Sequence, residues 1–200
     1  MNILTEEEAE LLLEKHGFLV VERELVRTKR EIDRVSIKFP WAMKISSKHI
    51  VHKAKIGGTV LNIRSVKEAK LAFDKLSAIP NYEGVLVQKM ISGEELILGL
   101  KKTPEFGLVI LVGSGGSNVE QEKDVSFRVV PIKEQDAEAM IKELKVYNNL
   151  RKQNLAEVKK CMLKLSNFAL KNKDLTELDI NPLMVNKTEA IIADARVVFN

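Results

Sequence analysis

Cysteine is nearly absent from this chain of 200 residues, because Cys161 is the single one. A disulfide framework is therefore excluded. Because Cys161 lies in an apolar helical pattern, we expect its thiol to be packed in the core. Aromatic residues make up only 5% of the sequence, which argues against stacking surfaces for single-stranded nucleic acid. No apolar run approaches the ~20 residues of a membrane span, and nothing resembles a signal peptide. We expect a soluble, cytoplasmic protein with neither a membrane nor a nucleic-acid partner.

Apolar and charged residues are plentiful, unlike cysteine and the aromatic residues. The apolar content of 45% suffices for one domain or two small lobes. The 32 basic residues are interleaved with 28 acidic ones, and the net charge is a modest +4. Such a surface favours contacts between basic residues and the phosphates of a small ligand, or a partner subunit.

Helical and strand-like patterns alternate along the chain. A capping box at Thr5 and Glu8 opens a first helix, and Gly17 is placed to end it. Further helices are expected from Thr28 to Phe39, from Ser65 to Leu76, and over 135–144 and 155–171, with strands over 18–22, 41–45, 84–90, 95–100, 108–112 and 129–132. This order is neither a Rossmann fold nor a helical bundle. It predicts an α+β fold, a mixed sheet with helices, arranged as two lobes.

Oxygen-bearing side chains gather around a predicted hairpin near the C-terminus. Two apolar runs, 182–185 and 190–193, flank the turn residues 186–189. Glu177, Asp179 and Asn181 precede the first run and Asp194 closes the second, so an antiparallel return brings Asn181 beside Asp194. Such a cluster suits Mg²⁺ that keeps several waters and takes other ligands from nucleotide phosphates. Solvated acids at the ends of strands are the alternative.

Polar residues also interrupt the predicted strands of the N-terminal half. Lys44 lies in an apolar strand, where a buried ammonium needs an anion; the alternative is a lysine on a solvent face. The loop that follows contains three lysines, two histidines and the pair Gly57-Gly58, and glycines let the backbone N–H groups approach phosphates. It lacks the spacing of a Walker loop.

A third polar stretch follows the strand that begins at Gly84. The edge backbone from Lys89 to Ile91 is suited to an adenine ring, and Glu95 to a ribose hydroxyl, although ordinary hairpin residues look the same. A second glycine-rich turn, Gly113-Ser114-Gly115-Gly116, is either a ligand loop or a tight chain reversal.

Taken in order, these motifs resemble the ATP-grasp β subunit, or β region, of the ADP-forming acyl-CoA synthetases, which are relatives of succinyl-CoA synthetase. The resemblance covers almost the whole chain. Its pieces are Lys44-Ile45, His52-Lys53, Gly57-Gly58, 87–90, 95–99, 104–107, 113–116, Val119-Glu120, 123–128 and 177–183. The last two are specific motifs, whereas the glycine pairs are not.

The resemblance implies a two-lobed ATP-grasp fold over residues 1–200, with a small lobe at about 20–85 and a C-terminal lobe at about 86–200. It places Lys44, Lys53, Gly57 and Gly58 beside ATP phosphates, Gln88, Lys89 and Met90 at adenine, and Glu95 at ribose. Mg²⁺ falls on Asn181 and Asp194. His52 becomes a candidate phosphate carrier.

The implied reaction converts acyl-CoA, ADP and phosphate into acid, CoA and ATP, reversibly. A CoA-binding α subunit is the implied partner, in an α2β2 assembly. One departure is the stretch from Tyr147 to Asn154, which lacks the glycine of the family's glycine- and arginine-containing turn. A nucleotide-binding or regulatory subunit without turnover, and a different ATP-grasp carboxylate ligase acting alone, therefore stay open.

Overall fold

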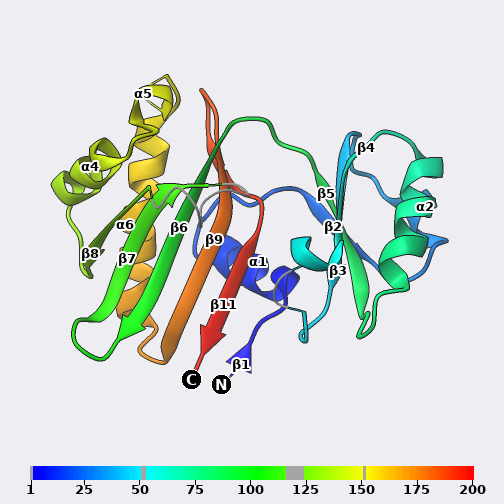
Figure 1. Ribbon diagram of the computed structural model, residues 1–200, viewed down its shortest axis with the longest axis horizontal. Coiled ribbons are helices and arrows are strands. Elements are labelled where there is room, and N and C mark those ends of the chain that lie inside the picture. The colour runs from blue at the N-terminus through cyan, green and yellow to red at the C-terminus, as the bar shows by residue number, and fades with distance from the viewer. Residues whose placement is uncertain (1, 51–52, 116–123, 151) are drawn as a thin grey trace. The chain divides into compact units, whose positions relative to one another are not determined.

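The computed structural model describes residues 2–50, 53–115, 124–150 and 152–200, and the chain divides into two compact units. One unit joins Met1–Val20 to Ser92–Asn200, and the other is the segment Val21–Ile91 between them. Each unit has its own sheet and its own helical cover (Figure 1). No helix in the described ranges is long and apolar enough to cross a bilayer.

The first unit contains what we call the large sheet. Its described strands are β1 (Asn2–Ile3), β6 (Glu94–Thr103), β7 (Gly107–Ser114), β8 (Val125–Val129), β9 (Leu175–Val185), β10 (Ala190–Ile192) and β11 (Ala195–Phe199). They run in the order β1-β11-β9-β6-β7-β8, with β10 also paired to β9. All of these pairings are antiparallel, and β8 lies at one edge.

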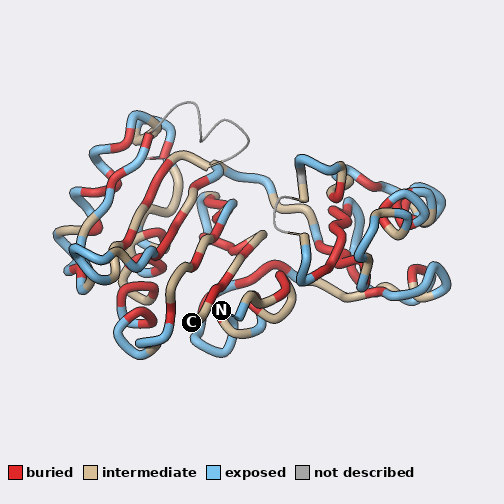
Figure 2. Tube along the Cα trace, turned by 60° about the horizontal axis from the view of Figure 1, so that its bottom comes forward, coloured by how far each residue is buried: buried red, intermediate tan, exposed pale blue. Residues whose placement is uncertain are grey.

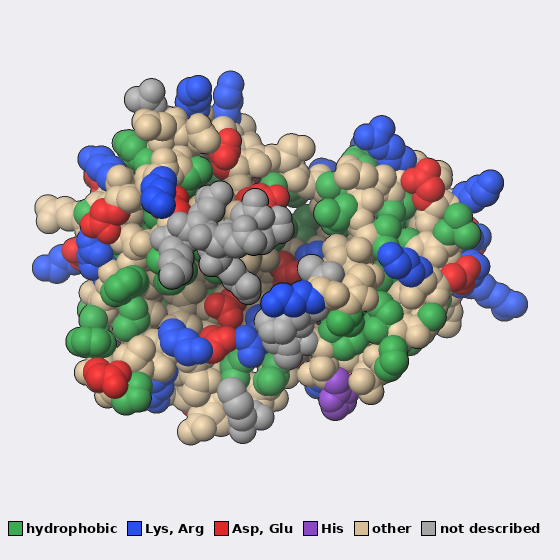
Figure 3. Space-filling view, viewed as in Figure 1, with side chains coloured by type: hydrophobic (Ala, Val, Ile, Leu, Met, Phe, Trp, Pro, Cys, Tyr) green, Lys and Arg blue, Asp and Glu red, His purple; other side chains and the backbone are tan. Residues whose placement is uncertain are grey.

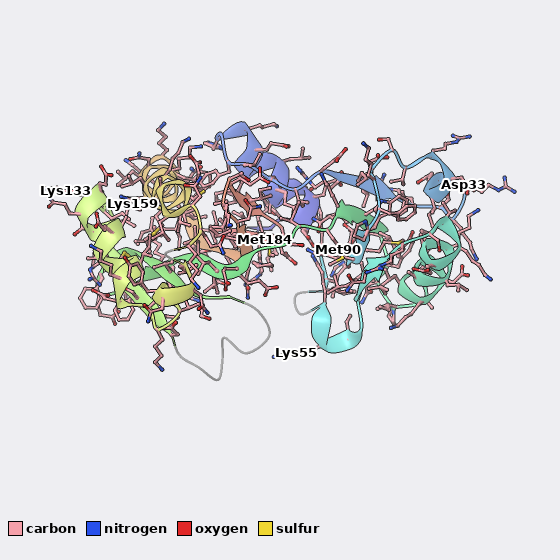
Figure 4. All side chains as sticks on the ribbon, turned by 90° about the horizontal axis from the view of Figure 1, so that it is seen from above. Asp33, Lys55, Met90, Lys133, Lys159 and Met184 are labelled. Carbon is pink, nitrogen blue, oxygen red and sulfur yellow. The ribbon has the colours of Figure 1, made fainter. Side chains whose placement is uncertain are left out.

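Helices cover one face of the large sheet. They are α1 (Glu6–Lys15), α4 (Glu134–Glu143), α5 (Tyr147–Leu150) and α6 (Leu155–Lys171). Figure 4 shows α4 and α6, marked by Lys133 and Lys159, together on the same side of the sheet. Figure 2 shows that buried residues recur along the chain of this unit. Leu98, Leu178 and Ile180 belong to the core between sheet and helices. Alternation along the strands therefore turns Gly99, Lys101, Glu177 and Asp179 to the opposite side, the open face.

The second unit contains the small sheet. Its strands are β2 (Arg23–Val26), β3 (Trp41–Ser46), β4 (Thr59–Ile63) and β5 (Gly84–Lys89), in the order β2-β5-β3-β4. Helix α2 (Val66–Ser77) covers the face that carries Trp41, Met43, Val85 and Val87. Two 3₁₀ turns, η1 (Glu31–Arg34) and η2 (Ala54–Ile56), complete the unit.

Several sequence predictions are confirmed in detail. Thr5 and Glu8 form the reciprocal capping box of α1, since each side chain accepts from the other residue's backbone N–H. Ser65 caps α2 through the N–H of Glu68. Helix α6 has the predicted bounds, and Cys161 is a buried free thiol.

Three predicted elements are wrong. The strand over 18–22 is only an isolated bridge between Val20 and Ile192, and β2 begins at Arg23. The helix from Thr28 to Phe39 is only the single turn η1, because the backbone is already extended at Val35, the residue that follows it. The strand over 129–132 lies instead at Val125–Val129, since Ile132 N–H donates to Ser166 of α6.

Candidate functional site

Asn181 and Asp194 lie side by side, as the hairpin pattern predicts. Asn181 N–H donates to the backbone oxygen of Asp194 at 3.1 Å, and Ala193 N–H donates to the Pro182 oxygen at 3.1 Å. The first bond joins β9 to the link between β10 and β11, while the β9–β10 register pairs Leu183 with Ile192. The two residues are therefore held side by side by main-chain bonds.

A charged cluster lies beside this pair on the open face. Lys101 of β6 contacts Glu177 at 2.5 Å, and Arg196 of β11 contacts Glu177 as well as Asp179, the latter at 3.5 Å. The strand register brings these four side chains together. Asp179 lies opposite both Gly99 and Arg196, and Glu177 lies opposite Lys101. The sequence motif pointed to Glu177 and Asp179 but gave no sign of Lys101 or Arg196, which come from distant strands.

The two carboxyl groups of the cluster have opposed pKa shifts. Burial, followed by a hydrogen bond to Glu177 and the charge of that residue, raises the pKa of Asp179 to about 6. Burial also opposes ionisation of Glu177, but hydrogen bonds from Lys101 and Asp179 and the charge of Arg196 hold its pKa below the usual value. Glu177 therefore carries the negative charge that balances the two cations, and Asp179 takes up a proton more readily.

The donor set is compatible with Mg²⁺ bound partly through other ligands. No group of three His, Cys, Asp or Glu residues arranged to hold a metal ion occurs among the residues that the structure describes. Asn181 and Asp194 supply one amide oxygen and one carboxylate, which leaves most of an octahedral shell to waters and phosphates. Mg²⁺ is commonly bound in this way in nucleotide sites.

Glu95 lies on the same unit, near the start of β6, and its side chain is exposed. Gly115 N–H donates to the Glu95 backbone oxygen at 2.7 Å. A Cβ at Gly115 would lie 2.6 Å from the Glu95 carbonyl carbon, so only glycine permits this approach. The glycine-rich turn thus packs directly on the backbone of Glu95, while its last member, Gly116, lies outside the described residues.

Lys44 and Gln88 share the face of the small sheet that α2 does not cover. Lys44 is paired with Leu86 and Thr59, and Gln88 is paired with Ala42 and Arg23, which makes Lys44 and Gln88 diagonal neighbours. Both are buried, Lys44 to 7% exposure and Gln88 to 1%. Lys44 is therefore not the solvent-facing lysine of the alternative interpretation. Arg23, which the sequence did not single out, lies on the same face.

The Gly57-Gly58 turn is held against the strand of Lys44. Ile45 N–H donates to the Gly58 oxygen at 2.8 Å, and Gly58 N–H donates to the Lys53 oxygen at 2.8 Å. A Cβ at Gly58 would lie 2.7 Å from Ile45 Cγ2, and Gly57 has a φ of +70°. The backbones of Ile45, which follows Lys44, and of Lys53 are thus both bonded to Gly58. His52, the proposed carrier, lies outside the described residues.

The segment predicted to hold adenine has most of its backbone donors engaged. Lys89 N–H donates to the Glu22 oxygen at 3.0 Å and Met90 N–H to the Pro40 oxygen at 3.1 Å. The Met90 sulfur, labelled in Figure 4, accepts from Asn62 N–H at 3.1 Å. Two of the three backbone N–H groups from Lys89 to Ile91 are therefore engaged within the protein.

Comparison with known proteins matches these features to one family. The model of the ATP-grasp domain matches residues 1–199. The chain is 36% identical over 211 residues to the β subunit of ADP-forming acetate–CoA ligase I from Pyrococcus furiosus, covering 98% of this chain and 91% of the relative. It is 38% identical to ADP-forming acetate–CoA ligase II of Archaeoglobus fulgidus, covering 98% of this chain but only 30% of that protein.

A solved structure agrees with the sequence matches. The acetyl-coenzyme A synthetase 1 of Candidatus Korarchaeum cryptofilum, in complex with coenzyme A and Ca-AMPCP, superposes with a TM-score of 0.92 at 34% identity, covering 99% of this chain and 93% of the other. The chain therefore belongs to the ATP-grasp family, in the group of the β subunits of ADP-forming acetate–CoA ligases.

Proposed function

We propose that this chain is the nucleotide-binding subunit of an ADP-forming acid–CoA ligase, which interconverts acyl-CoA, ADP and phosphate with acid, CoA and ATP in the cytoplasm. The observation that carries this proposal is the joined pair Asn181 and Asp194 on a chain that matches whole β subunits. The chain spans about a third of the length of the single-chain relatives.

The residues divide the work between positioning and charge neutralisation. Lys44 and Lys53 bind phosphate oxygens beside the Gly57-Gly58 turn, where glycine lets the backbone come close to a phosphate. Gln88, Lys89 and Met90 line the adenine, and Glu95 accepts from the ribose. Asn181 and Asp194 would hold Mg²⁺, which would neutralise charge on the phosphates. Phosphoryl transfer needs little more than such positioning and charge.

His52 is the proposed carrier between the partner and the nucleotide. In the direction of ATP formation, a nitrogen of its imidazole attacks the phosphorus of a phosphohistidine on the partner, whose imidazole leaves. An oxygen of the ADP β-phosphate then attacks the phosphorus on His52, and the imidazole is released as ATP forms. A neutral imidazole is a competent nucleophile near pH 7.

Features of relatives support the cofactor and the partner. The Korarchaeum enzyme has been solved with coenzyme A and Mg-AMPPCP, with a phosphohistidine segment pointing towards its nucleotide-binding site. The Pyrococcus relative is named as a β subunit. We assign this chain a CoA-binding α subunit as its partner, in an α2β2 assembly.

The test is phosphorylation by labelled nucleotide. The chain is incubated with ATP labelled in the γ-phosphate and Mg²⁺, alone and with its CoA-binding subunit. We expect acid-labile, base-stable phosphoprotein that ADP discharges to labelled ATP. Nucleotide binding without any phosphoprotein would instead identify a non-catalytic ATP-binding subunit.

A further inference from the structure

The edge strand β8 has its apolar residues turned outward. Val125, Phe127 and Val129, which we call the β8 strip, are 39%, 63% and 51% exposed. The residues between them point the other way. Ser126 donates to Glu143 of α4 at 2.5 Å, and Arg128 forms an ion pair with the same carboxylate. A strand that binds its own helix through polar residues and exposes its apolar ones reverses the usual arrangement.

Neighbouring residues of β7 extend the strip on the open face. Phe127 lies opposite Leu111, and Val129 lies opposite Val109; both partners on β7 are partly exposed. Phe106, in the turn that leads into β7, is 65% exposed. Figure 3 shows hydrophobic atoms gathered over β7 and β8. Contiguous exposed apolar area of this kind marks an interaction surface more often than isolated residues do.

A single register row runs from the strip to Asp179 and Arg196, beside the candidate metal pair. Phe127 pairs with Leu111, Leu111 with Gly99, Gly99 with Asp179, and Asp179 with Arg196. Asp179 is two residues from Asn181. Strands are ~4.8 Å apart, so Phe127 and Asp179 are separated by roughly 14 Å across one face. Gly99 contributes no side chain at the centre of this row.

We propose that the CoA-binding subunit docks on the β8 strip. This inference rests on the proposed function, in which a phosphoryl group passes between the partner and a nucleotide at Asn181 and Asp194. The partner must then approach the open face, which carries that pair. In the single-chain relatives about two thirds of the ligase lies outside the part that matches this chain. Phe127 supplies the aromatic anchor, because exposed aromatic residues often dominate the energy of such interfaces.

Association with the purified CoA-binding subunit tests the proposal. Phe127→Glu should weaken binding at least tenfold in sedimentation velocity or biolayer interferometry. Leu170→Glu, on a residue of α6 that is 52% exposed, is the matched control and should bind as the wild type does. Circular dichroism and thermal unfolding verify the fold, and Val129→Lys replaces Phe127→Glu if that variant does not fold.

Nucleotide binding provides the independent readout. Calorimetry should give equal Mg·ADP affinity for wild type and Phe127→Glu. If the wild-type chain does not bind Mg·ADP, that result contradicts the proposed function and not the docking site. Partner binding by Phe127→Glu at wild-type affinity overturns the proposal. So does self-association of the wild-type chain through Phe127 with partner binding unaffected, since the occupant would then be a second copy.

Discussion

The backbone N–H of Asn181 and the backbone oxygen of Asp194 form a hydrogen bond of 3.1 Å. This bond places the two residues together without using either side-chain oxygen. Substitution of a side chain here should therefore change the chemistry of the pair more than the geometry of the strands. The pair is the part of the proposed site that can be tested most cleanly.

Asp194→Asn should weaken Mg·ADP binding by tens-fold. The replacement removes one negative charge from the proposed ligand set, and an interaction with a charged group is worth ~2 kcal/mol. The fold should be retained, because the new side chain is nearly isosteric. Isothermal titration with ADP and Mg²⁺ measures the change, with Glu105→Gln on the exposed β6–β7 turn as the control. Unchanged Mg·ADP affinity in a folded variant would remove this hairpin from the site.

Lys44→Met should reduce Mg·ADP affinity at least tenfold, because a hydrogen bond between an ammonium and a phosphate is worth about 1.5–3 kcal/mol. Adenosine has no phosphate, so its affinity should stay unchanged. Titration of both ligands separates the two effects. Lys67→Met, at an exposed position of α2, serves as the matched control. An equal loss for adenosine would show that Lys44 supports the fold of the site rather than the phosphates.

Cys161 should make the protein less stable at high pH. Burial raises the pKa of its thiol from 9.0 to about 11. The folded state therefore keeps the proton between these values while the unfolded chain releases it, and stability falls as pH rises through that window. A shift of about two units corresponds to roughly 2–3 kcal/mol. Urea unfolding of wild type and Cys161→Ala from pH 8 to 11 should show the extra slope only in the wild type; parallel curves would contradict it.

Local signals in the sequence were sufficient for the elements that have clear ends. Asn154 caps α6 by accepting from Glu157 N–H, and the apolar stripe from Leu155 continues to the last turn. The hairpin of β9 and β10 follows from two apolar runs around a turn in which the Asn186 side chain accepts from Thr188 and Glu189. In each case the residues that determine the structure are neighbours along the chain.

Features that depend on distant strands could not be foreseen. Lys101, Glu177 and Arg196 meet only because β6, β9 and β11 are adjacent in the large sheet. The strand β8 was missed because its inward positions are polar and bind Glu143 across the fold. The single turn η1 was mistaken for a helix from Thr28 to Phe39, because a local helical pattern does not reveal how soon the chain turns away.

His52→Ala tests the central claim most directly. ATP formation from acyl-CoA, ADP and phosphate is measured with the CoA-binding subunit present, beside the Mg·ADP affinity of the same variant. The account predicts that ATP formation is abolished while Mg·ADP affinity is unchanged, because the adenine and metal contacts are assigned to other residues and only the phosphate carrier is lost. His49→Ala, three residues earlier in the same loop, is the matched control and should retain activity. Full ATP formation by His52→Ala would contradict a carrier role and leave this loop as a phosphate-binding segment only.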